Sequence, residues 1–165
     1  MTSLQNRLAI VVVVIASAMS ALAGQPKVGD VFPALADFKL EGTLPDLKDK
    51  VVVVDFWASW CGPCKASFPA FVELHEKFAD KGLVILAVSL DEDKSDMEGF
   101  LKKTKVPFAT VRDAKQKLAE KLSIESIPTT FILGRDGKIA ALHNGYGGDS
   151  TKRELIADVD KLLKK

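Results

Sequence analysis

The only two cysteines of the chain, Cys61 and Cys64, lie where a buried strand is expected to give way to a helix. Residues 51–56, just before them, form a run of mostly β-branched side chains, which is typical of a central strand buried on both faces. After them, apolar residues recur at helical spacing from Pro63 to Lys81. A strand that leads through a Cys-x-x-Cys pair into a helix predicts an α/β fold.

The position of Cys61 at the start of this helix favours nucleophilic chemistry. Unpaired backbone N–H groups and the positive end of the helix dipole stabilise a thiolate there. Gly62 allows a tight backbone approach, and Pro63 is tolerated in a first helical turn because its missing N–H would have no partner. We expect Cys61 to be the exposed nucleophile and Cys64, facing inward one turn later, to resolve the mixed disulfide.

A metal site and a purely structural disulfide are the alternatives for the cysteine pair. A zinc site would need two further ligands, and the chain offers only His75 and His143, which we expect in surface or packing roles. A disulfide that closes a four-residue ring constrains the unfolded chain little. We therefore expect a redox-active Cys61–Cys64 disulfide, no metal and no other cofactor.

The charge of the chain points to no nucleic-acid partner. Its 165 residues include 23 basic and 22 acidic side chains, so the formal net charge is +1. Hydrophobic residues make up 47% of the chain, which excludes a disordered tail or a fibre. We expect one globular domain that acts as a monomer and binds no nucleic acid.

Residues 1–23 differ in composition from the rest of the chain and predict export. Arg7 is their only charged residue, a long apolar run follows it, and the segment ends on an Ala-x-Ala pattern. We expect a signal peptide over residues 1–23, cleavage before Gly24 and a periplasmic domain over residues 24–165. The alternative is an inner-membrane anchor helix over residues 4–23, since a span needs about 20 apolar residues.

The remaining pattern predicts an alternation of strands and helices. The expected elements are short edge strands or turns within 32–40 and 44–47, strands at 83–90 and 108–111, helices at 95–106 and 113–122, a hairpin with its turn at 134–137, and a C-terminal helix ending at Leu163. Capping boxes are expected to open at Ser95 and Thr151. This order predicts a three-layer α/β/α sandwich around a mixed central sheet.

The segment Val54–Lys65, Val-Asp-Phe-Trp-Ala-Ser-Trp-Cys-Gly-Pro-Cys-Lys, resembles the active-site stretch of thioredoxins. The wider chain resembles the TlpA/ResA-like family of secreted thioredoxins, through Val28–Pro33, Leu47–Lys50, Phe68-Pro69 and Ile127–Phe131. The resemblance implies a thioredoxin-like fold and thiol-disulfide exchange on the periplasmic face. Such proteins commonly act in the reducing direction, including the reduction of apocytochrome c before haem attachment.

The resemblance also assigns a role to Asp55, which matches the buried acid of thioredoxins. Burial would raise its pKa and let it take a proton from Cys64 as that thiol attacks. The alternative is a carboxylate paired with a lysine. Ser67 departs from the family pattern, because ResA-like chains often carry a glutamate there, and this departure weakens the inference of cytochrome specificity.

The substrate-binding residues implied by the resemblance surround the cysteine pair. Pro128 matches the family's cis-proline, with a trans proline in an edge strand as the alternative. The backbone around Ile127 would pair with an extended substrate segment by strand addition. Trp60, beside Gly62 and Pro63 in the motif, would add apolar surface.

The expected function is that of a thiol-disulfide oxidoreductase that reduces the disulfides of exported proteins. Its Cys-Gly-Pro-Cys motif is of the type found in strongly reducing thioredoxins, whose potential is about −270 mV. A reductant in an oxidising compartment must be recharged, which implies a membrane electron donor of the DsbD kind. The alternatives are a thiol oxidase or isomerase, a metallochaperone or a binding module. A peroxidase is disfavoured because Ala58 stands where peroxiredoxin-like chains have Thr or Ser.

Overall fold

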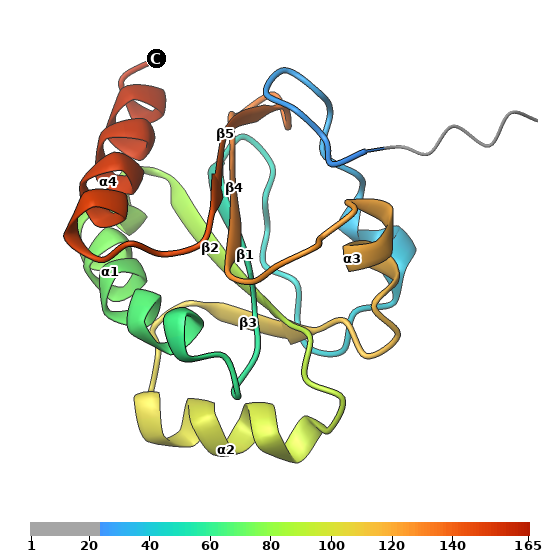
Figure 1. Cartoon of the computed structure of the whole chain (residues 1–165). Helices are drawn as coiled ribbons and strands as arrows, with labels where there is room; N and C mark the ends of the chain where they lie inside the picture. The colour runs from blue at the N-terminus through green and yellow to red at the C-terminus, as the bar shows by residue number, and fades with distance from the viewer. Residues whose placement is uncertain (1–23) are drawn as a thin grey trace, which may run out of the picture.

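A five-stranded mixed sheet in the order β3-β2-β1-β4-β5 forms the centre of the computed structural model, which describes residues 24–165 (Figure 1). The strands are β1 (Val51–Trp57), β2 (Leu83–Ser89), β3 (Ala109–Arg112), β4 (Thr129–Leu133) and β5 (Ile139–Asn144). β1, β2 and β3 run parallel, whereas β4 is antiparallel to both β1 and β5. The expected signal peptide lies outside the described residues.

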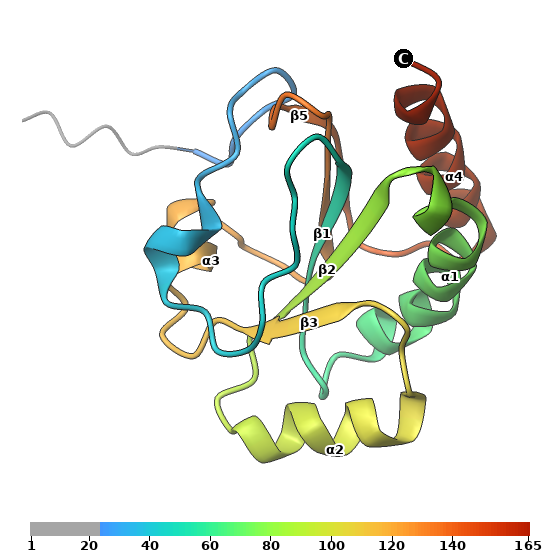
Figure 2. The ribbon, with the colours of Figure 1, turned by 180° about the vertical axis from the view of Figure 1, so that it is seen from behind.

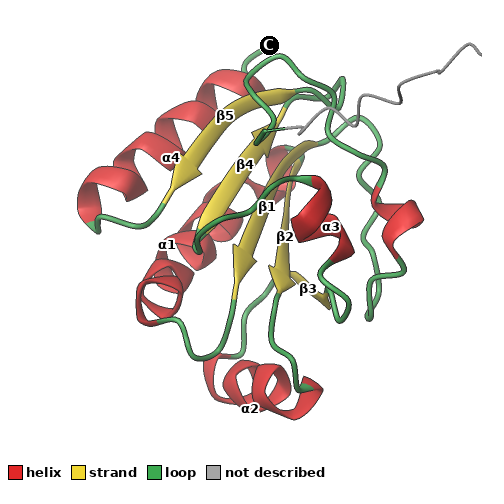
Figure 3. Cartoon of the chain, turned by 45° about the vertical axis from the view of Figure 1, so that its right-hand side comes forward, coloured by secondary structure: helices red, strands yellow, loops and turns green. Residues whose placement is uncertain are grey.

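Helices cover both faces of this sheet. They are α1 (Gly62–Phe78), α2 (Lys94–Thr104), α3 (Lys117–Lys121) and α4 (Asp149–Leu163), with short 3-10 turns η1 (Leu35–Phe38) and η2 (Ala79–Lys81). Figures 1 and 2 show α1 beside α4 on one face, and η1 beside α3 on the other. Figure 3 shows α2 beyond the ends to which β1 and β2 point. The predicted thioredoxin-like three-layer sandwich is confirmed.

Strand β1 is buried along its whole length because elements pack on both of its faces. The side chains at positions 52, 54 and 56 belong to the core shared with η1 and α3, whereas Val51 and Val53 pack with α1 and α4. Since side chains alternate along a strand, Asp55 and Trp57 lie on the α1 side. The buried acid therefore faces the helix that carries the cysteines.

Several element boundaries differ from the sequence prediction. α2 begins one residue before the capping box expected at Ser95, and α4 begins two residues before the box expected at Thr151. The helix expected over 113–122 is reduced to the five residues of α3, because Gln116 adopts a left-handed conformation with φ of 53°. Residues 32–40 contain the turn η1 and no regular strand. Across residues 24–165, none of the helices is both long enough and apolar enough to cross a membrane.

Candidate active site

The two cysteines are joined by a disulfide at the first turn of α1, where the chain leaves β1. Cys61 caps this helix, and its Sγ accepts a hydrogen bond from the backbone N–H of Cys64 at 3.2 Å. Pro63 lies in the first turn, where a helix needs no N–H from it. Cys61 keeps 6% of its surface exposed whereas Cys64 is completely buried, so Cys61 is the more accessible cysteine of the pair.

Asp55 lies in the core of the sheet and has no charged partner within the described part of the chain. It is completely buried, and its Oδ1 accepts a hydrogen bond of 2.7 Å from Thr130 Oγ1 on the neighbouring strand β4. Its partner is thus a threonine rather than a lysine, and its Oδ2 has no partner among the described residues. Burial raises the pKa of Asp55 to about 8, although the Thr130 hydrogen bond opposes the shift. The carboxyl is therefore mostly protonated at pH 7 and can exchange a proton with a neighbour near that pH.

The loop that precedes β4 lies against Cys61. The bond between Ile127 and Pro128 is cis, as the resemblance implied. The carbonyl oxygen of Ile127 is 3.7 Å from Cys61 Sγ, and Ile127 is partly exposed while Pro128 is buried. A peptide segment lying along Ile127 would therefore lie next to the Cys61 sulfur.

Trp60 is the large aromatic side chain that this site presents to solvent, with 69% of its surface exposed. Gly62 and Pro63 are exposed on the other side of Cys61 in the motif. Trp57, in contrast, is completely buried, and its ring centroid lies 4.7 Å from that of Phe68. Trp60 thus contributes to the surface of the site, and Trp57 belongs to the core.

A buried carboxylate that the sequence analysis missed holds the loop before Cys61. Asp91, just beyond β2, accepts hydrogen bonds from the N–H and the hydroxyl of Ser59 at 3.0 and 2.7 Å, and from the Ser89 hydroxyl at 2.7 Å. Ser59 lies two residues before Cys61, so Asp91 fixes the chain where it enters the active-site turn. Part of the signal was present in the sequence, because Ser59 and Asp91 each lie shortly after the end of a predicted strand.

Ser67 is buried, and its hydroxyl donates to the carbonyl oxygen of Cys64 at 2.8 Å. The hydroxyl therefore bonds to the backbone of α1. The position at which ResA-like chains often carry a glutamate places no acid beside the cysteines here.

The histidines lie away from the cysteine pair in this fold. His143 on β5 contacts two acids of α4, with its Nε2 3.0 Å from Asp158 and its Nδ1 3.7 Å from Glu154. His75 lies in α1 and is partly buried beside Phe108. Over the part of the chain that the structure describes, no three His, Cys, Asp or Glu side chains form a group that could hold a metal ion.

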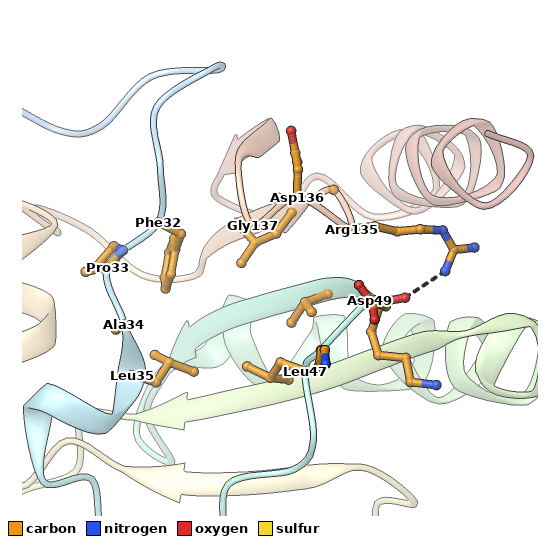
Figure 4. A pocket seen from close by; sticks show the side chains of 14 residues that line it. Phe32, Pro33, Ala34, Leu35, Leu47, Asp49, Arg135, Asp136 and Gly137 are labelled. Atoms are coloured by element: carbon orange, nitrogen blue, oxygen red, sulfur yellow. Dashed lines mark hydrogen bonds between the residues drawn. The ribbon is translucent and has the colours of Figure 1, made fainter.

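A separate hollow of about 330 Å³ lies at the other end of the sheet, between the turn at 134–137 and the segments 32–35 and 47–50 (Figure 4). Arg135 Nη1 donates to the carbonyl oxygen of Asp49 at 2.9 Å in this region. The turn at 134–137 follows the end of β4, whereas Ile127 precedes its start. The length of β4 therefore separates this hollow from Cys61.

Comparison with known proteins places the chain in a family. The AhpC/TSA family matches residues 28–142. The chain belongs to the AhpC/TSA family. This family match covers the whole central sheet apart from the last two residues of β5, and it includes both cysteines.

Curated relatives of this AhpC/TSA-family chain include thiol-disulfide oxidoreductases named ResA. One such protein of Bacillus cereus is 32% identical over 139 residues, which is 82% of this chain and 79% of that protein. The protein of Bacillus subtilis (strain 168) is 33% identical over 134 residues, which is 78% of this chain and 73% of that protein. The predicted resemblance to ResA-like thioredoxins is therefore confirmed.

Solved structures give the same result for this AhpC/TSA-family chain. A putative thiol:disulfide interchange protein DsbE from Chlorobium tepidum is 33% identical with a TM-score of 0.77, over 83% of this chain and 98% of that one. StoA from Bacillus subtilis is 28% identical with a TM-score of 0.59, over 67% of this chain and 83% of that one. Together with the Cys61–Cys64 disulfide, these relatives identify the chain as a thiol-disulfide oxidoreductase.

Proposed function

We propose that this oxidoreductase is a periplasmic disulfide reductase for exported proteins. The Cys61 thiolate of the reduced protein attacks one sulfur of a client disulfide, and the other client sulfur leaves and takes up a proton. Cys64 then loses its proton and attacks Cys61 Sγ, which releases the second client sulfur and forms the Cys61–Cys64 bond. The cysteine pair gives two electrons to the client, and each client sulfur takes up one proton from the surrounding water. The observation that carries this proposal is the disulfide at the start of α1 with Cys61 as its less buried member.

In this mechanism the ionised form of Asp55, which is the minor form at pH 7, accepts the proton that Cys64 loses during resolution. Asp55 is on the β1 face that α1 covers, and its pKa of about 8 lets it gain and lose a proton near neutral pH. Both Asp55 and Cys64 are buried, so the proton has no direct access to bulk water. A buried carboxyl group supplies the acceptor that solvent cannot.

The client binds to the surface around Cys61. The backbone of the partly exposed Ile127 pairs with an extended client segment, and the buried Pro128 follows it in the loop before β4. Trp60, with Gly62 and Pro63, supplies the apolar surface on which the client rests. These contacts hold the client disulfide at Cys61 Sγ.

The proposed setting is the periplasm, after cleavage of residues 1–23 from a domain that spans residues 24–165. The protein acts there as a monomer, and a membrane electron donor of the DsbD kind returns it to the dithiol form. Apocytochrome c is one proposed class of client. Measurement of the intact mass of the exported protein tests the boundary, because retention of residues 1–23 would indicate the anchored form.

The direction of electron flow is tested by the reduction potential. Equilibration of the purified protein with dithiothreitol or glutathione buffers should give a value near the roughly −270 mV of thioredoxin. A potential above about −180 mV, the value of protein disulfide isomerase, would favour a thiol oxidase or isomerase instead.

The clients can be identified by trapping. Substitution Cys64→Ala removes the resolving thiol, so clients should remain attached to Cys61 as mixed disulfides. The matched variant Cys61→Ala should trap none, because Cys64 is buried. Equal trapping by both variants would contradict the assignment of Cys61 as the nucleophile.

A further inference from the structure

Two adjoining hollows lie beside Cys61, and we call them together the client trough. Both are lined by Trp60, Leu90 and Gln116. The first, of about 390 Å³, adds residues 124–127, and the second, of about 280 Å³, adds residues 91–93 and Asp96. The trough is therefore continuous across Trp60 from the cis-proline loop to the start of α2.

Four of the residues that line the client trough are apolar, lie near the reactive sulfur, and together are called its floor. Leu90, Ile124 and Ile127 are partly exposed there, and Trp60 is largely exposed. The Ile127 carbonyl oxygen is 3.7 Å from Cys61 Sγ, and Trp60 directly precedes Cys61 in the chain. A client whose disulfide reaches Cys61 must therefore place neighbouring residues over this floor.

The rim of the client trough is acidic. The exposed carboxylates are those of Glu92, Asp93, Asp96 and Glu125, and among the described residues none of the four side chains has an ion pair. Within residues 24–165, no Lys or Arg lines either hollow. Negative charge around an apolar floor attracts cations and repels anions.

The N-terminus of α2 accounts for part of this acidity, because the helix dipole favours acids such as Asp93 and Asp96 there. Asp93 precedes the first residue of α2, but its side chain makes no capping hydrogen bond. Asp91, in contrast, is buried and bound to Ser59 and Ser89, so its carboxylate is already occupied. The rim carboxylates remain free to meet a partner.

The negative rim is a local feature of a domain without net charge. Residues 24–165 contain 22 basic and 22 acidic side chains, since Arg7 is the only charged residue before them. Several basic groups lie near the rim. Arg112 Nη1 donates to the carbonyl oxygens of Asp91 and Glu92, and the same guanidinium pairs with Glu41 at 2.8 Å. Lys94 pairs with Glu98 at 3.4 Å, while Lys65 and Lys103 line another hollow that shares Asp96 with the trough.

We propose that the client trough selects disulfides flanked by lysine or arginine, with an apolar side chain of the client resting on Trp60. This inference rests on the proposed function and adds a class of client to it. The rim carboxylates speed the association with such a client and fix which of its residues lie in the trough. The disulfide exchange itself remains the two-step reaction of Cys61 and Cys64. Clients with acidic residues beside the disulfide are repelled.

The test uses two synthetic peptides that each hold one intramolecular disulfide. They are identical except that the residues flanking the attacked cysteine are lysine in one and glutamate in the other. The reduced protein should react about tenfold faster with the lysine peptide, after each rate is divided by the rate with dithiothreitol. This division removes the effect of the flanking charge on the intrinsic reactivity of the peptide's disulfide.

Two matched double variants assign the selectivity to the rim. Glu92→Gln with Asp93→Asn should lower the corrected ratio about fivefold, because two of the rim charges are lost. Glu76→Gln with Asp80→Asn makes the same chemical change at the opposite end of α1 and should leave the ratio as it is. In the unaltered protein, raising the salt from about 20 mM to about 1 M should bring the ratio close to one.

The peptide rates test the charge selection and the reductase activity separately. A corrected ratio of one in the unaltered protein, or an unchanged ratio in Glu92→Gln/Asp93→Asn, overturns the charge selection but leaves the reductase intact. Failure to reduce either peptide overturns the proposed function itself. A dimer in sedimentation that dissociates on Trp60→Ser would show that the trough is covered by a second copy, and would also overturn the inference.

Discussion

Asp55 is a carboxyl group held in its neutral form by the fold. Its complete burial raises its pKa to about 8, and Thr130 supplies the single hydrogen bond to Oδ1. In the unfolded chain the same group has a pKa of about 3.9. Between these two values the folded protein binds one proton more than the unfolded chain, so its stability falls as the pH rises.

The first prediction concerns Asp55→Asn, which removes this titration and keeps the shape of the side chain. The stability that protonated Asp55 contributes is fully present below about pH 4 and is lost as the pH rises to about 8. At each pH, the free energy of unfolding of the original protein is subtracted from that of the variant. This difference should be roughly 4 kcal/mol larger at pH 7 than at pH 4. Urea unfolding of the oxidised proteins at both pH values measures it.

The same variant separates stability from catalysis. If Asp55 is the proton acceptor, Asp55→Asn should slow the release of a mixed disulfide at Cys61 while the protein becomes more stable at pH 7. Quenched mass spectrometry of the mixed disulfide follows this rate. A more stable variant with an unchanged release rate would make Asp55 a structural acid only.

The second prediction concerns the order in which the two thiols react. The start of α1 favours the thiolate of Cys61, and Cys64 is buried. In the reduced protein, iodoacetamide should modify Cys61 first and at a pH well below 8.5, the approximate pKa of a free cysteine. Peptide mapping after short reaction times identifies the modified residue, and early labelling of Cys64 would reverse the assignment.

At the scale of elements, α3 depends on a residue that lies outside it. Asp113 is buried, and its carboxylate accepts hydrogen bonds from the backbone N–H groups of Lys117, Leu118 and Ala119 at 2.9 to 3.0 Å. A helix of five residues is too short to be stable by itself. Asp113 therefore ties the start of α3 to the end of β3.

The third prediction follows from these three hydrogen bonds. Asp113→Ala should lower the free energy of unfolding by about 2 to 3 kcal/mol, because buried N–H groups lose their acceptor. The exchange of the Leu118 and Ala119 amide hydrogens should become faster than that of β1. Asp96→Ala, an exposed acid without a hydrogen-bonded side chain, is the control and should change stability by less than about 0.5 kcal/mol.

The elements that the sequence predicts well are those with a long, regular pattern. The buried run of β1, the amphipathic face of α1 and the hairpin of β4 and β5 each carry a clear period. The capping boxes at Ser95 and Thr151 were wrong because a local four-residue pattern recurs inside helices as well as at their starts. Similarly, Asp113 caps α3 across a left-handed Gln116, a backbone turn that periodicity does not encode.

The residues of the candidate site also divide into those that the sequence predicted and one that it missed. The cysteine motif places Cys61 and Cys64 directly, and the resemblance supplies Pro128 and Asp55. Asp91 was missed because its partner Ser59 is 32 residues away, and only the parallel pairing of β1 with β2 brings the two together. Contacts made by strand pairing require the sheet order, which no local pattern contains.

At the scale of the whole molecule, one sheet links all three groups of buried side chains. The η1–α3 face, the α1–α4 face and the group around Trp57 and Phe68 each include side chains of β1. Loss of β1 would therefore open all of them together. This arrangement favours a single cooperative unit.

The fourth prediction is that residues 24–165 unfold in one step. A fragment that begins at Gly24 should show a single calorimetric transition whose measured enthalpy equals the van't Hoff enthalpy. The midpoint should match that of the longer chain in the same redox state. Two transitions, or loss of folding in the fragment, would contradict the proposed domain boundary.

The far end of the molecule offers a place for attachment. Lys165, at the end of the chain after α4, lines a hollow with Gly134 and Arg135, at the end of β4 that is distant from Ile127 (Figure 1). A bead, an electrode or a fluorescent protein joined through Lys165 would leave the Cys61 sulfur facing outward. The protein can therefore be immobilised as an oriented capture surface for disulfide-bearing partners.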